Sequence, residues 1–85
     1  AEARRLTGNA EAQALALESA RRSLCLLTND GTLPLDRTRF RKVALVGPNA
    51  AVARLGGYSG LPSRTVSLAD ALRRRLPADA LAVAQ

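Results

Sequence analysis

The stretch Val43-Ala-Leu-Val-Gly-Pro-Asn-Ala50 decides how the rest of this chain is interpreted. Its first four residues form a short, continuous apolar run with branched side chains, and Gly47-Pro48 ends the run. An apolar run of this length between turn residues predicts a strand that is buried on both faces. The turn at 47–50 then carries the chain away from the sheet. We therefore expect the fold to be organised around a strand at 43–46.

A second strand follows this one, and a helix connects the two. Ser67 is a good cap for a helix over residues 68–76, and Pro77 blocks its continuation. Leu81 to Ala84 is again a short apolar run. A strand–helix–strand crossover normally makes two parallel neighbours in one sheet. The expected fold class is therefore α/β, with a partial parallel sheet and flanking helices, and other residues must complete the sheet because both of its edges are open.

The connection between the first strand and the second helix is rich in glycine. Residues 51–55 favour a single helical turn, whereas Gly56-Gly57-Tyr58-Ser59-Gly60 predicts a loop. Three glycines in five positions permit backbone angles that other residues resist. Tyr58 is therefore expected on a loop.

Upstream, residues 10–29 predict a long helix. Small and apolar residues recur there at spacings of three and four, which places them on one helix face. Asn9 is suited to cap the start, and Asn29-Asp30-Gly31 is suited to stop the helix. Leu33-Pro34-Leu35 follows and is expected to fill a crevice between domains.

Length and composition limit the classes of function. The 85 residues suffice for one small domain, and a formal net charge of +6 raises the hypothesis of an acidic partner. No aromatic residues are interleaved with the arginines to stack on bases, so solvated arginines are favoured over a nucleic-acid surface. Cys25 is the only cysteine and histidine is absent, so we expect no disulfide within the chain, no metal and no cofactor. No apolar run is long enough to span a bilayer, and both ends look cut from a longer protein.

Motifs of nucleotide binding and of hydrolase triads are missing. The turn at 47–50 lacks the glycine spacing of a phosphate loop, and Pro48 removes one amide donor. Ser59 lies between glycines, but without a histidine it has no conventional base. The carboxylates are scattered, and Glu2, Glu11 and Glu18 are expected to be surface charges. We therefore assign no catalytic residue to this chain.

Three segments together resemble the start of the second domain of family 3 glycoside hydrolases. They are the helix end Ala20-Arg-Arg-Ser-Leu-Cys-Leu-Leu-Thr-Asn-Asp-Gly31 with Leu33-Pro-Leu35, the stretch 43–50, and Leu55-Gly-Gly-Tyr-Ser-Gly60. The resemblance implies a fragment of an α/β sandwich domain. It assigns residues 1–31 to a helix that links this domain to a catalytic barrel, and residues 32–85 to its first strand–helix–strand portion.

The resemblance also implies an activity. Members of this family are retaining, exo-acting β-glycosidases that use an aspartate nucleophile and a separate carboxylic acid. Neither group lies in the matching segments, so the implied function is an inactive fragment of an enzyme that cleaves β-glucosides or β-xylosides. The tyrosine form of the third segment is closest to members that act on xylosides. The expected partners are a glycoside or oligosaccharide substrate and the barrel of the same protein, with no nucleic acid and no membrane.

Tyr58 is the one candidate substrate-binding residue. The resemblance implies that its ring lines the subsite of the leaving group, and the alternative is that it packs on its own loop and anchors the glycines. Asn49 is interpreted as a turn-stabilising residue and Cys25 as a small residue packed in the helix. The alternative function for the whole chain is a small basic module that binds an acidic partner or nucleic acid.

Overall fold

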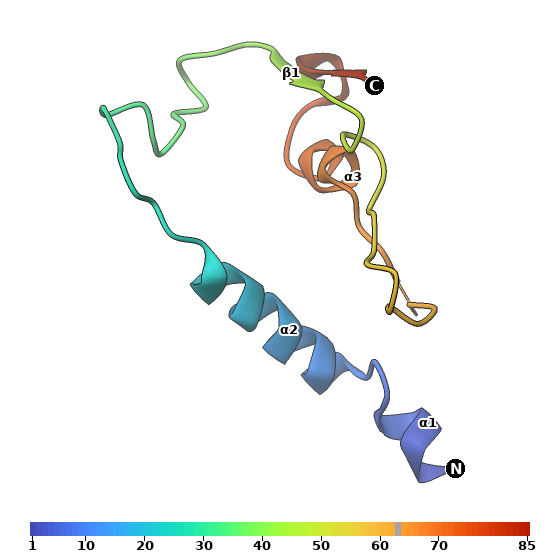
Figure 1. The fold of residues 1–85 in the computed structure, drawn as a ribbon. Helices are drawn as coiled ribbons and strands as arrows, with labels where there is room; N and C mark the ends of the chain where they lie inside the picture. Colours follow the sequence, from blue (N-terminus) through green and yellow to red (C-terminus); the bar gives the residue numbers. More distant parts are fainter. Residues whose placement is uncertain (63) are drawn as a thin grey trace. The chain divides into compact units, whose positions relative to one another are not determined.

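The computed structural model describes residues 1–62 and 64–85. These form two compact units, Ala1–Pro34 and Leu35–Gln85. The first contains two helices, and the second contains two strands with a helix between them. Figure 1 shows the elements of both units along the chain.

The first unit begins with two helices. Helix α1 spans Glu2–Leu6 and helix α2 spans Ala10–Ser23. The Asn9 side chain accepts a hydrogen bond of 2.8 Å from the backbone N–H of Ala12, which confirms the predicted cap. The prediction that the helix continues to residue 29 was wrong, because Leu24 already has an extended backbone. A helix depends mainly on the packing of its apolar face, and Leu24 and Leu27 are exposed here.

The segment after α2 is held by polar side chains. Asn29 Oδ1 accepts from the N–H groups of Gly31 and Leu33, and Asn29 Nδ2 donates to the carbonyl of Leu33 at 2.7 Å. The Asn-Asp-Gly stretch therefore forms a turn, but it does not end the helix. Leu33 and Leu35 are exposed in this chain, and their docking between domains stays a prediction. Cys25 is also exposed and lies outside the helix, so its predicted packing role was wrong.

The second unit contains the predicted parallel sheet. Strand β1 (Val43–Val46) pairs with strand β2 (Leu81–Ala84) in parallel, with Val43 opposite Leu81 and Val46 opposite Ala84. This confirms a partial parallel sheet with helices. Burial on both faces was wrong for the chain alone, because half-buried residues alternate with exposed ones along each strand. A two-stranded sheet needs further layers to cover its second face.

Helix α3 (Leu68–Arg73) connects the strands and contacts β2. Its regular part ends three residues before the predicted Leu76, although the N–H of Leu76 still bonds the carbonyl of Leu72 at 2.9 Å. A short 3₁₀ turn, η1 (Ala78–Ala80), leads into β2. Among the described residues only Ala50 and Ala69, which are 3% and 0% exposed, form a buried apolar core.

Candidate functional site

The connection that follows β1 leaves from the carboxyl end of the sheet. In open α/β sheets, ligands bind beyond the carboxyl ends of the strands. The N–H of Gly47 donates to the carbonyl of Ala84 at 3.0 Å, which extends the pairing of the strands by one residue. Figure 1 shows the connection as a long arm that leaves β1 and returns to α3. This connection is therefore the part of the second unit best placed for a ligand.

Two backbone hydrogen bonds anchor the base of this connection. The N–H of Ala50 donates to the carbonyl of Gly47 at 3.1 Å, and the N–H of Ala69 donates to the carbonyl of Ala50 at 2.9 Å. Gly47 has φ +140°, a backbone angle that side chains other than hydrogen resist. Because Ala50 is also buried, the turn is fixed against the first residues of α3.

Asn49 forms a polar contact that the sequence did not reveal. Arg54 Nε donates to Asn49 Oδ1 at 2.6 Å. Asn49 therefore contacts the connection through its side chain. Its predicted role of stabilising the turn at 47–50 stays a prediction. Residues 51–55 are not helical, so the predicted helical turn was wrong. The contact between Arg54 and Asn49 could not be predicted from the sequence, because an asparagine and an arginine five positions apart form no recognisable motif.

Tyr58 lies on the predicted glycine loop. The N–H of Ser59 donates to the carbonyl of Gly56 at 3.0 Å and closes a turn around Gly57 and Tyr58. The Tyr58 side chain is fully exposed. The alternative that it packs on its own loop was therefore wrong. An exposed aromatic ring on a loop beyond the carboxyl end of a strand is available to contact a ligand.

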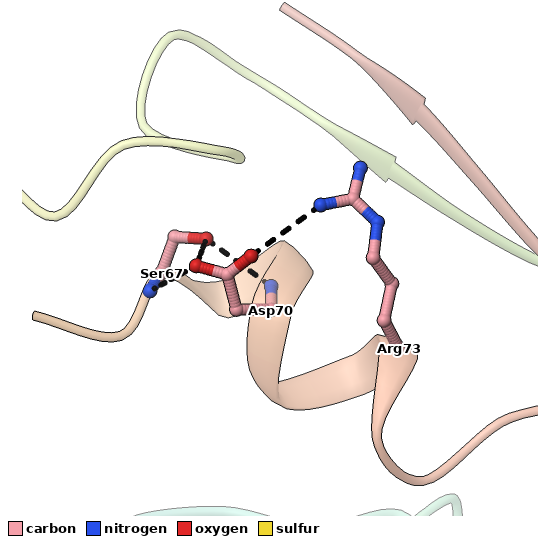
Figure 2. A network of polar contacts seen from close by, with 3 residues as sticks. All are labelled: Ser67, Asp70 and Arg73. Carbon is pink, nitrogen blue, oxygen red and sulfur yellow. Dashed lines mark hydrogen bonds and ion pairs between the residues drawn. The ribbon is translucent and has the colours of Figure 1, made fainter.

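A compact polar network marks the start of α3 (Figure 2). Ser67 Oγ donates to Asp70 Oδ2 at 2.8 Å and accepts from the N–H of Asp70 at 3.1 Å, and Arg73 lies 3.5 Å from Asp70 Oδ1. The hydrogen bonds from Ser67, and then the charges of Arg73 and Arg74, hold the pKa of Asp70 below its usual value. These contacts form a capping box. The spacing Ser67-Leu-Ala-Asp70 is a recognisable form of this motif, so the carboxylate is explained by helix capping.

An open depression of about 470 Å³ lies beside α3 and β2. Its lining residues are Arg73, Pro77, Ala78, Leu81 and Val83. Among its described lining residues Arg73 is the only charged one, and it is already paired with Asp70. The depression therefore offers few polar groups that could orient a ligand.

The acidic groups of the first unit lie on its surface. Glu2 pairs with Arg5 at 2.6 Å and Glu18 pairs with Arg22 at 2.8 Å, while Glu11 is exposed in the first turn of α2. Within residues 1–62 and 64–85, no three His, Cys, Asp or Glu side chains gather in a way that could hold a metal. No helix in the same part of the chain is both long and apolar enough to cross a membrane.

Comparison with known families gives a direct assignment. Residues 24–85 match the model of the glycosyl hydrolase family 3 C-terminal domain. The chain belongs to this family. The match begins at Leu24, directly after α2, and includes both strands, α3 and the connection that carries Tyr58.

Several curated relatives carry names of glycosyl hydrolases. The chain is 42% identical over 79 residues to "Beta-xylosidase" of Formosa agariphila, a match that covers 82% of this chain and 11% of that protein. It is 45% identical over 64 residues to "Probable beta-D-xylosidase 7" of Arabidopsis thaliana, covering 72% and 8%. It is 39% identical over 69 residues to "Beta-glucosidase" of Rhizobium radiobacter, covering 78% and 8%.

The chain thus spans about a tenth of the length of these relatives. No solved structure matches it. The match establishes that the α/β elements of this chain belong to a family 3 C-terminal domain.

Proposed function

We propose that the protein containing this chain is a β-glycosidase that removes terminal β-linked xylosyl residues from glycosides. The observation that carries the proposal is the family match over residues 24–85. Xylosides are preferred because two of the three relatives described above are named as xylosidases. β-Glucosides are the second candidate substrates, since a relative named as a β-glucosidase is 39% identical over 69 residues.

The mechanism we propose is hydrolysis with retention of configuration at the anomeric carbon. In this mechanism one carboxylate attacks that carbon and a second carboxyl group protonates the leaving oxygen. We place both groups in the rest of the protein, because the carboxylates of this chain are either scattered on helix surfaces or engaged in turns and in the cap of α3. Residues 1–31 then link a catalytic barrel to residues 32–85, which begin the C-terminal domain.

We further propose that Tyr58 contributes to the subsite of the leaving group. Its full exposure and its loop beyond the carboxyl end of β1 support this role. An aromatic ring suits the apolar face of a sugar, and the hydroxyl adds a hydrogen bond. In the whole enzyme, Tyr58→Ala should raise KM for substrates with a bulky aglycone by roughly three- to tenfold, about 0.6–1.4 kcal/mol of lost binding. Tyr58→Phe should retain most of the affinity, and an unchanged KM for Tyr58→Ala would rule the role out.

The activity itself is tested with the whole protein. We expect it to hydrolyse 4-nitrophenyl β-D-xyloside with a higher kcat/KM than 4-nitrophenyl β-D-glucoside. The isolated 85-residue chain should hydrolyse neither substrate. A whole protein that is inactive on both would refute the proposed function, and a preference for the glucoside would replace xylosides by glucosides as the main substrates.

A further inference from the structure

Among the described residues, Arg54 is the one side chain that ties the middle of the connection between β1 and α3 to its base. Arg54 Nε donates to Asn49 Oδ1 at 2.6 Å. Asn49 directly precedes Ala50, whose N–H and carbonyl are both engaged in the anchored turn. The contact therefore joins residue 54 to a fixed point at the carboxyl end of the sheet.

The stretch between these two residues has little other support. Among the described residues, none of the positions 51–55 takes part in a backbone hydrogen bond of the connection, and the next bond is the turn from Ser59 to Gly56. Gly56 and Gly57 add backbone freedom directly before Tyr58. Ordering residues 51–57 costs conformational entropy. Without the Arg54 contact, little in this stretch would offset that cost.

We propose that Arg54 is a positioning residue: through its hydrogen bond to Asn49 it fixes the path of residues 49–54 and thereby the direction in which the loop presents Tyr58. The guanidinium group suits this role because it is planar and always charged, so the bond to the amide oxygen persists at all working pH values. This inference rests on the proposed function, since it assigns the loop to the leaving-group side of the substrate.

Kinetics of the whole enzyme test this role. Arg54→Ala and Asn49→Ala should each raise KM for an aryl β-xyloside by roughly threefold to tenfold, because the loop no longer positions Tyr58 for the bound substrate. The value of kcat should change less than about twofold, because the chemical step is not affected. The double variant should be no worse than either single variant, because both changes break the same contact. Asn49→Asp should keep the KM of the wild type, since a carboxylate accepts from a guanidinium in a charge-assisted bond.

Two controls separate this role from a general effect of charge or stability. Arg64→Ala removes an exposed arginine ten positions later in the same connection and should leave KM unchanged. A substrate with a small leaving group, such as β-xylosyl fluoride, should show the same KM in the wild type and in Arg54→Ala. If Tyr58→Ala raises KM for the aryl substrate and Arg54→Ala does not, the inference is overturned while the proposed function stands.

A second measurement does not depend on activity. Trypsin cleaves after arginine, and cleavage requires a loop that can open locally. In the folded enzyme, Asn49→Ala retains Arg54 but loses its partner, so the initial rate of cleavage after Arg54 should rise severalfold, and Asn49→Asp should restore the slow rate. Equal rates in the wild type and Asn49→Ala would overturn the inference. If the wild type hydrolyses no glycoside, the proposed function and the subsite role fail together, and the trypsin rates still decide whether Arg54 holds the loop.

Discussion

Gly47 is the residue at which the chain turns away from the sheet. Its φ of +140° is a backbone angle that favours glycine, although a Cβ built there would meet no described atom within 4 Å. The cost of Gly47→Ala therefore comes from the backbone angle alone, and we expect a loss of about 1–3 kcal/mol. Gly57→Ala is the matched control, because Gly57 has equal space and no positive φ. Thermal denaturation of the whole enzyme should show a lower midpoint for Gly47→Ala and a nearly unchanged one for Gly57→Ala.

Single residues differ in how well the sequence predicts their roles. Asn9 and Ser67 were predicted correctly as helix caps, because a cap bonds the backbone two or three residues away and its pattern is local. The exposure of Tyr58 and the bond from Arg54 to Asn49 depend on the path of a loop with several glycines. Such a path follows from tertiary contacts rather than from local preferences. The sequence therefore left two alternative roles open for Tyr58 and did not suggest any role for Arg54.

At the scale of the element, the capping box is the main local support of α3. Ser67 is buried, and its hydroxyl accepts from the N–H of Asp70 while the Asp70 carboxylate accepts from the N–H of Ser67. Ser67→Ala should destabilise the helix by about 1 kcal/mol. Hydrogen exchange of the amides of residues 68–76 in the whole enzyme measures this directly. Exchange should become faster in Ser67→Ala than in Ser59→Ala, an exposed serine outside any helix, and equal rates would contradict the role of the cap.

The same helix should depend on pH through Asp70. Its folded-state pKa is lowered, mainly by the hydrogen bonds from Ser67. A carboxyl group whose pKa lies lower in the folded state than in the unfolded state stabilises the fold above the unfolded value of about 3.9, and this contribution is lost as pH falls through the folded pKa. Amide exchange in α3 should therefore show an extra loss of protection below about pH 4 that Asp70→Asn lacks. The same acid dependence in Asp70→Asn would assign the effect to another group.

The ends of the helices show what the sequence leaves open at this scale. The start of α2 agrees with the prediction, whereas its end at Ser23 lies well before the predicted stop at residues 29–31. The apolar positions after Ser23 would extend the helix only if another surface covered them. Leu27, with 92% of its surface exposed, has no such cover in this chain. The strands and their parallel pairing were predicted correctly because the crossover rule constrains a strand–helix–strand order.

For the whole molecule, the amount of buried apolar surface is small. Only two alanines are buried apolar residues in the described part of the chain, while many leucines and valines are exposed. Burial of apolar side chains is the dominant favourable term in folding, so we expect the isolated chain to be loosely packed or to associate. It should bind a dye that reports exposed apolar surface and should lack a cooperative thermal transition. A sharp, reversible transition of the monomer would contradict this expectation.

We propose that this chain belongs to a β-glycosidase of family 3 that retains the anomeric configuration. The most direct measurement is a proton NMR time course of the whole protein with an aryl β-D-xyloside, in which the anomeric signals of the first product are followed before mutarotation. We expect β-xylose to appear first and the α-anomer only later. Initial release of α-xylose would contradict the retaining mechanism, and no release of sugar from the xyloside or from the matching glucoside would contradict the assignment as a glycosidase.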